Sequence, residues 1–270
     1  MSCPNLTILS KGISSKRVVI GLYIPHMKLE VFTFKWGTKY GPEYVNRLYG
    51  SLLRHINVPF NFTCITDDTT GLRDEIKTID YNTFDPFPYP KDRIFTREKL
   101  VLLNHSTADH NMWIDLDVLV HGDITEYVTR DLDKPTFIFN HWTSIDRTML
   151  RFGWGAVCHI NSSFVCWTQD RGKWLYDYTM KEIDKVAFTY NSLDKYLFYR
   201  HWTHDNLGLW EDGIVYNYNY NNPNNEMKGD YKIALFNTSH IEMTGRPKDA
   251  LELHEAEGWA KEMWESYDES

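Results

Sequence analysis

Two aspartates, Asp115 and Asp117, lie two residues apart in the apolar segment Met-Trp-Ile-Asp-Leu-Asp-Val-Leu. In a β-strand over 111–120, this spacing places both carboxylates on the same face. An unpaired carboxylate in an apolar site costs several kcal/mol, so the pair requires positive partners, either Lys and Arg side chains or a hard divalent cation. A turn at 121–123 follows the strand, and open α/β sheets bind ligands at such carboxyl ends. We therefore predict a site for a cation or an ion pair at one edge of a sheet.

The elements that position this pair alternate between strands and helices. The first half predicts strands at 17–24, 30–35, 61–66 and 111–120, helices at 42–55 and 97–104, and a loop rich in proline and aromatic residues at 81–90. This order is typical of a mostly parallel sheet with helices on both faces. Because parallel strands end at one edge, we expect the loops at 35–40 and 67–71 to meet the aspartate pair. The second half is less regular, with strand segments at 136–140, 157–167 and 231–236 and helices near 171–184, 192–200 and 249–265.

Composition narrows the possible classes of protein. The chain has 270 residues without repeats or linker-like segments, so we expect one unit over 1–270 with halves of about 17–123 and 124–270. The net charge of −8 argues against a general nucleic-acid coat and against anchoring on anionic membranes. No segment approaches the length of a membrane span and no signal peptide precedes the first strand, so we expect a cytoplasmic protein without stable membrane insertion. The 4 cysteines lack zinc-site spacing, and motifs for dinucleotide or ATP binding are missing.

Several segments together resemble nucleotide-sugar glycosyltransferases of the GT-A fold, in particular glycogenin-like enzymes and the bacterial or viral relatives that carry Asp-x-Asp. The resemblance covers roughly residues 28–260 and rests on the segments 32–40, 44–48, 64–68, 115–117, 161–163, 193–195 and 245–248. It implies an α/β GT-A fold, with a Rossmann-like, mostly parallel sheet and an irregular α+β acceptor lobe. Two positions depart from the pattern: no histidine directly precedes Gly245, His240 being the nearest, and Lys195 replaces a frequent glutamine.

The resemblance also implies a reaction and a set of contacts. A metal-dependent enzyme would move a hexose from a nucleoside-diphosphate sugar, expected to be a UDP-sugar, to the hydroxyl of a glycan or another acceptor. Mn²⁺ or Mg²⁺ would neutralise the leaving diphosphate. The implied residues are Asp115, Asp117 and His240 for the metal; Thr33, Tyr40 and Asp67 for the base and ribose; Lys35 as a further donor-binding residue; Lys99 or Arg97, Arg246 and Lys248 for the diphosphate; and Asp194 and Asn161 as catalytic residues at the sugar.

Other interpretations remain open at this stage. The chain is alternatively a viral-type glucosyltransferase acting on modified DNA bases, a nucleotidyltransferase, or a sugar-binding module without turnover. Single residues also have structural interpretations: Asp123 and Asp68 as caps of a helix and a turn, Asn161 as a hydrogen bonder at a strand end, Lys99 as a solvated side chain. His201, His204 and Asp205 have the spacing of metal ligands on a helix, although an aromatic loop lining the acceptor cleft is favoured.

Overall fold

The computed structural model describes residues 27–84, 96–153, 157–220, 222, 224–236 and 250–269. The predicted strand at 17–24 lies outside these residues, as do His240, Arg246 and Lys248. None of the helices in the described part of the chain has the length and apolar character needed to cross a membrane.

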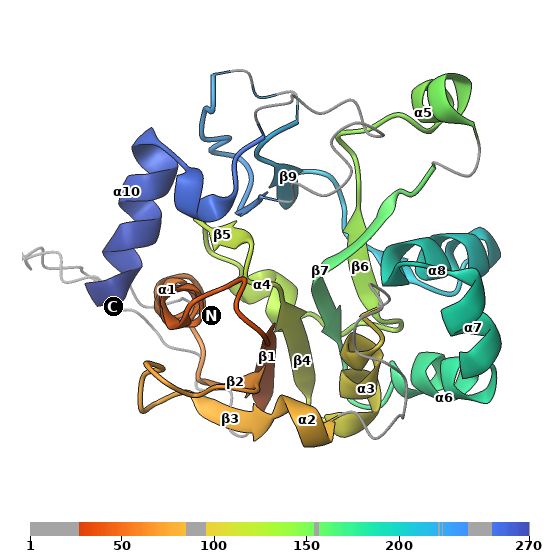
Figure 1. The fold of residues 1–270 in the computed structure, drawn as a ribbon, viewed down its shortest axis with the longest axis horizontal. Helices are drawn as coiled ribbons and strands as arrows, with labels where there is room; N and C mark the ends of the chain where they lie inside the picture. Colours follow the sequence, from red (N-terminus) through yellow and green to blue (C-terminus); the bar gives the residue numbers. More distant parts are fainter. Residues whose placement is uncertain are drawn as a thin grey trace, which may run out of the picture.

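A seven-stranded, mostly parallel sheet forms the centre of the molecule (Figure 1). Its order is β3-β2-β1-β4-β7-β6-β8, in which β7 runs antiparallel to both of its neighbours. The α/β class with a mostly parallel sheet is thereby confirmed. The strands are β1 (Leu29–Lys35), β2 (Phe60–Thr66), β3 (Lys77–Asp80), β4 (His110–Ile114), β6 (Thr136–Phe139), β7 (Ile160–Trp167) and β8 (Gly208–Leu209).

Helices cover both faces of this sheet (Figure 1). Leu29 and Val31 of β1 belong to one apolar cluster, whereas Phe32 and Phe34 belong to another on the opposite face. This alternation is what a strand buried on both faces requires. The helices are α1 (Pro42–His55), α2 (Tyr81–Phe84), α3 (Glu98–His105), α4 (Thr125–Val128), α5 (Ile145–Phe152), α6 (Lys173–Lys181), α7 (Ile183–Thr189), α8 (Leu193–Arg200) and α10 (Gly258–Ser266), with short 3₁₀ turns at Trp202–His204, Leu253–Glu255 and Tyr267–Glu269.

The helix α1 matches its prediction at both ends. Pro42 lies in the first turn, where its missing N–H removes no hydrogen bond. Val45, Leu48 and Leu52 follow at helical spacing and are buried against the sheet. The chain then leaves the helix at Ile56 in an extended conformation, which leads into β2.

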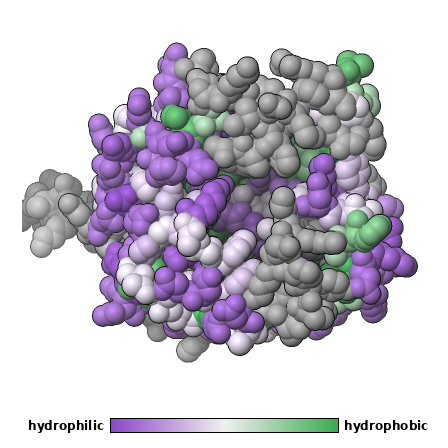
Figure 2. Space-filling model, viewed as in Figure 1, coloured by the Kyte–Doolittle hydropathy of each residue, from purple (hydrophilic) through white to green (hydrophobic). Residues whose placement is uncertain are grey.

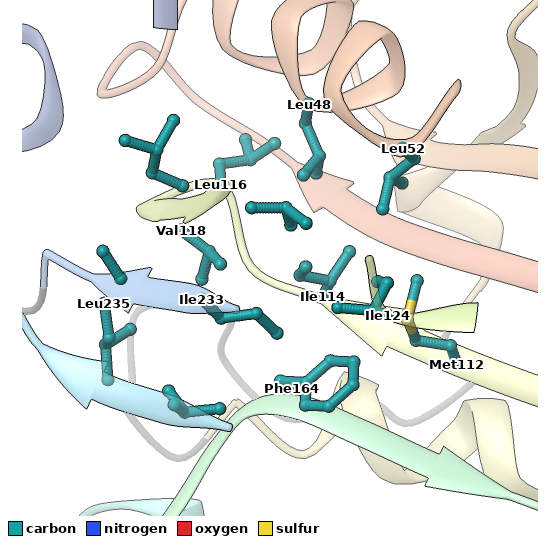
Figure 3. Packing of buried hydrophobic residues seen from close by; sticks show 14 of the residues in the cluster. Leu48, Leu52, Met112, Ile114, Leu116, Val118, Ile124, Phe164, Ile233 and Leu235 are labelled. Atoms are coloured by element: carbon teal, nitrogen blue, oxygen red, sulfur yellow. The ribbon is translucent and has the colours of Figure 1, made fainter. Parts of the chain in front are cut away.

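The predicted strand over 111–120 was wrong as a single element. It ends at Ile114, and β5 (Val118–Val120) pairs instead in a second sheet with β10 (Ile233–Leu235) and β9 (Val215–Asn217). Asp115 and Asp117 therefore lie in the link between the two sheets, so the argument from one strand face does not hold. Leu116 between them is 3% exposed and packs in the cluster that Figure 3 shows beneath α1.

Hydrogen bonds explain why β4 ends at this position. The paired register of β1 and β4 stops at Phe32 and Trp113. The Ile114 carbonyl, one residue further along β4, accepts a hydrogen bond of 2.8 Å from the Thr33 hydroxyl. A side chain thus replaces the ladder, and the backbone is released towards the second sheet.

Other differences are local. The helix predicted near 171–184 is two helices, α6 and α7, separated at Glu182, where ψ is 20°. The edge strand β3 and the single turn of α2 were not predicted, because β3 is mostly exposed and offers no apolar alternation. The C-terminal helix begins at Gly258 and not near 249.

We predict that Gly208→Ala loosens β8. A Cβ there would lie 3.1 Å from the Cβ and 3.3 Å from the Cα of its strand partner Thr136. Overpacking of this kind lowers the free energy of unfolding by about 1–3 kcal/mol, to be measured by urea denaturation. Gly229→Ala is the matched control, because no atom lies within 4 Å of its added Cβ. Equal stability of the two variants would contradict the assigned β6–β8 pairing.

Candidate active site

A pocket of about 370 Å³ opens where β1 and β4 end, beside the N-terminal turn of α3. Both members of the aspartate pair line it. The predicted convergence of the loop after β1 with the aspartates is therefore present. The lining residues are Phe34, Trp36, Lys39, Tyr40, Thr96, Lys99, Asp115, Leu116 and Asp117.

Asp115 is held by an ion pair. Its Oδ2 accepts a hydrogen bond of 2.6 Å from Nζ of Lys99. Lys99 is 8% exposed, and its ammonium also lies 3.4 Å from the Ser162 carbonyl on β7. The interpretation of Lys99 as a solvated side chain on a helix face was wrong, since α3 directs this charge into the pocket.

Asp117 is a half-buried carboxylate whose charge is less well compensated. Lys99 pairs with Asp115, and none of the ion pairs among the described residues includes Asp117. Burial raises the pKa of Asp117 from 3.8 to about 6, and the negative charge of Asp115 adds to this rise, while Lys99 and Lys39 oppose it. The pocket therefore contains an acidic group that favours an additional positive charge.

Asp194 and Asn161 lie one layer away from the pocket lining. Oδ1 of Asp194, at the start of α8, accepts the backbone N–H of Ser162 at 3.0 Å. Oδ1 of Asn161 accepts the N–H of Ser163 at 2.8 Å, as the interpretation of a hydrogen bonder at a strand end expects. Burial raises the pKa of Asp194, and the nearby Lys99 charge opposes the rise. Asp194 therefore ties the start of β7 to α8, and Asn161 orders the backbone within β7.

Three of the predicted donor-binding residues, Thr33, Lys35 and Asp67, lie near the pocket without lining it. Thr33 is fully buried and bonds to the Ile114 carbonyl. Lys35 is 4% exposed and reaches the Asp68 carbonyl at 3.4 Å. Asp67 accepts the Gly37 N–H at 3.0 Å, which ties the loop after β2 to the loop after β1. Arg97, at the start of α3, is buried outside the lining as well.

Tyr40 is the predicted nucleoside contact that does line the pocket. Its ring lies 4.8 Å from the ring of Tyr44, and the Lys39 ammonium lies 4.7 Å from its centroid. Burial raises the pKa of the Tyr40 hydroxyl, as do the charges of Asp117 and Glu252. Tyr40 therefore stays a neutral aromatic surface at any physiological pH.

Trp36 was missed as an individual site residue. Its indole is 41% exposed at the pocket and stacks on Tyr81, with 5.2 Å between ring centroids and 2° between planes. A tryptophan directly after an apolar strand was a usable signal. Lys39 follows in the same loop and also lines the pocket. Thr96, whose φ is 50°, lines the pocket as well, and no sequence pattern indicated it.

The remaining sequence hypotheses divide in two. Asp68 accepts the Thr70 N–H, as predicted for the cap of a turn. Asp123 accepts the Thr125 N–H, but the N-cap of α4 is Ile124, so the prediction of Asp123 as the helix cap was wrong by one residue. The described part of the chain contains no group of three or more His, Cys, Asp or Glu side chains arranged for a metal ion. The hypothesis that His201, His204 and Asp205 form a metal site is therefore not supported. His240, the third predicted metal ligand, lies outside that part.

Solved structures with a similar fold support the GT-A architecture, whereas comparisons by sequence found no match. No protein-family model and no curated protein matches the sequence. The apo form of the glycosyltransferase GlyE of Streptococcus pneumoniae TIGR4 aligns with 90% of this chain at a TM-score of 0.54 and 15% identity, and a second GlyE structure aligns with 89% at 0.52 and 15%. The chain spans 60% of the length of each GlyE chain.

The galactosyltransferase LgtC is a third similar structure. Solved in complex with donor and acceptor sugar analogues, it aligns over 89% of this chain and 95% of its own, with a TM-score of 0.54 and 12% identity. At these identities the likeness is one of fold. The chain therefore has the mixed α/β architecture of the GT-A glycosyltransferases.

Proposed function

We propose that this chain is a metal-dependent glycosyltransferase of the Asp-x-Asp type, which moves a hexose from a UDP-sugar to an acceptor hydroxyl. The observation that carries the proposal is the poorly compensated carboxylate of Asp117 beside the Lys99–Asp115 ion pair, at the carboxyl edge of a GT-A sheet. That edge is where open α/β sheets receive ligands.

The donor set suits a hard divalent cation. Mn²⁺ and Mg²⁺ prefer carboxylate oxygens. Two carboxylates line one pocket, and one of them has no ion-pair partner among the residues that the structure describes. Asp115 and Asp117 would hold the ion, with His240 proposed as a further ligand. When bound, the ion supplies positive charge that neutralises a diphosphate leaving group.

The chain's own cations act on the same charge. Negative charge grows on the diphosphate as the glycosidic bond breaks, and fixed positive groups in a pocket with little water stabilise it. Lys99 is held by Asp115 and the Ser162 carbonyl. Lys39 lines the same pocket from the loop after β1. Arg246 and Lys248 are proposed to add to this charge.

The aromatic side of the pocket suits a nucleoside. We assign base stacking to Trp36 and Tyr40, which both line the pocket, while Thr33, Lys35 and Asp67 keep the surrounding loops in place. Asp194 and Asn161 are proposed to act at the transferred sugar. Their side chains accept the N–H groups of Ser162 and Ser163 and so order the start of β7.

The first prediction concerns the donor. UDP-glucose, UDP-galactose and UDP-N-acetylglucosamine are titrated calorimetrically into the protein with MnCl₂ or with EDTA. We expect one donor to bind in a metal-dependent manner and Asp117→Asn to weaken it by about 10-fold or more, since even residues that only support a ligand contribute 10–100-fold to metal affinity. Asp123→Asn is the matched control, because Asp123 lies outside the pocket, where its carboxylate accepts the Thr125 N–H at the start of α4. Equal affinities in MnCl₂ and EDTA for every donor would refute the metal-dependent mechanism.

The second prediction concerns pH and uses no substrate. The folded pKa of Asp117, about 6, exceeds its ordinary 3.8, so its contribution to stability is complete below about pH 4 and is lost as pH rises through 6. In EDTA, we expect Asp117→Asn to gain stability over the wild type between pH 4 and pH 7, as measured by urea denaturation. MnCl₂ at pH 7 should stabilise the wild type alone. A stability difference that does not change with pH would show that the charge of Asp117 is already compensated.

The third prediction concerns the base. Trp36→Ala should weaken binding of UDP by about 5-fold to 100-fold, the range expected for loss of one stacked base. Trp36→Phe should keep most of the affinity because an aromatic face remains against Tyr81. Trp174→Ala, which removes an exposed tryptophan outside this pocket, is the control and should bind UDP as the wild type does. Unchanged UDP affinity in Trp36→Ala would place the base elsewhere.

A further inference from the structure

A second pocket, of about 250 Å³, lies among α6, the end of α8 and the 3₁₀ turn that follows. Its lining residues are Trp174, Tyr178, Arg200, His201, His204 and Asn206. None of them lines the aspartate pocket or contributes to it, so this cavity is a separate feature of the molecule.

The two pockets lie at opposite edges of the main sheet. Asn206 lies next to β8, which pairs with the start of β6 at Thr136, and Thr136 is in register with Cys166 near the end of β7. Asp194 instead bonds to Ser162, four residues earlier on β7, a separation of about 13 Å along the strand. The helix α8 spans this distance, with Asp194 at its first turn and Arg200 at its last.

One wall of the second pocket is aromatic. Trp174 and Tyr178 are four residues apart on α6 and therefore share a helix face. Trp174 is 36% exposed. Its ring also packs edge-on against His201, with 5.6 Å between ring centroids. In Figure 2 the coloured surface is mostly hydrophilic, with small separate hydrophobic areas near α5 and in the area of α7 and α8.

The polar wall offers a buried group without a partner. His201 is 2% exposed and surrounded by the rings of Trp174, Tyr178 and Tyr196. Its Nε2 makes no hydrogen bond to the described residues, and a buried nitrogen without a partner carries a desolvation cost that a ligand hydroxyl would offset. His204 and Asn206 are exposed on the same wall and carry hydrogen-bonding side chains.

The pocket carries little net charge. Arg200 bonds to the Tyr178 hydroxyl and lies 3.7 Å from Glu182, which offsets its positive charge. Burial lowers the pKa of His201 to about 4, with the charges of Arg200 and His204 adding to the effect, so this imidazole is neutral near pH 7. A neutral polar ligand matches both walls, because the aromatic rings present apolar surface and His204 and Asn206 carry hydrogen-bonding groups.

We propose that this pocket is a second, non-catalytic subsite for one neutral sugar residue of a glycan. The C–H face of a pyranose ring stacks on Trp174, as apolar surface does on an aromatic platform, and its hydroxyls bond to His201, His204 and Asn206. The volume lies just below the range of about 300–1,000 Å³ typical of drug-sized ligands, which suits a single ring. Binding at this subsite goes beyond the proposed transfer reaction and does not depend on it.

The test uses saturation-transfer NMR with four neutral probes: lactose, maltotriose, cellotriose and N,N′,N″-triacetylchitotriose. We expect at least one to bind the wild type, and Trp174→Ala to weaken it at least 5-fold. Trp174→Phe should restore part of the affinity, and Asn206→Ala should lower it without disturbing the core. Phe188→Ala is the matched control, because Phe188 is 85% exposed on α7 outside the pocket. Trp36→Ala should leave this binding unchanged.

Three results would overturn the proposal. The first is the absence of binding by any neutral probe up to about 10 mM. The second is binding that survives Trp174→Ala and disappears in Trp36→Ala, which assigns the sugar to the aspartate pocket. The third is binding of 3′-sialyllactose without binding of lactose, which marks an anion site. Donor titrations with UDP-sugars are read separately, so a failure here is distinguishable from a failure of the transferase proposal.

Discussion

The end of β4 is the constraint on which the site depends. The Thr33 hydroxyl donates a hydrogen bond to the Ile114 carbonyl, and the Asp115 N–H donates one to the Ser163 carbonyl on β7. The chain then crosses into the second sheet, where Phe236 donates its N–H to the Asp117 carbonyl. Two aspartates are thereby fixed between two sheets, while Leu116 anchors the link in the core (Figure 3). A continuous strand would have tied the same backbone into the sheet and left no pocket.

The same link separates the two carboxylates electrostatically. Asp115 forms an ion pair with the buried Lys99. The ionised form of Asp117 is instead disfavoured by burial and by the negative charge of Asp115. The backbone of Ser162 connects the Lys99 pair to α8, because its carbonyl lies 3.4 Å from the Lys99 ammonium and its N–H donates to Asp194. The pocket therefore contains one compensated and one poorly compensated carboxylate side by side.

Much of the architecture followed from local patterns. The helix α1 was predictable at both ends because Pro42 and an apolar stripe at helical spacing specify the same element. The strands β1 and β2 were predictable because their apolar runs are bounded by polar loops. The break within 111–120 was not predictable, since both halves are apolar and the cause is a hydroxyl 81 residues away. The edge strand β3 was missed because pairing and not composition makes it a strand.

The sequence alone determined the kinds of groups present and their order: an α/β succession, an Asp-x-Asp pair at the end of an apolar strand, and polar loops after the neighbouring strands. Tertiary structure decided which of these groups meet. It placed Lys99, Trp36 and Tyr40 on the aspartate pocket and moved Thr33, Lys35 and Asp67 into supporting positions. It also brought Trp174 to His201, as no local pattern predicts. The reason is physical: spacing along the chain sets the face of an element, whereas long-range contacts set what that face meets.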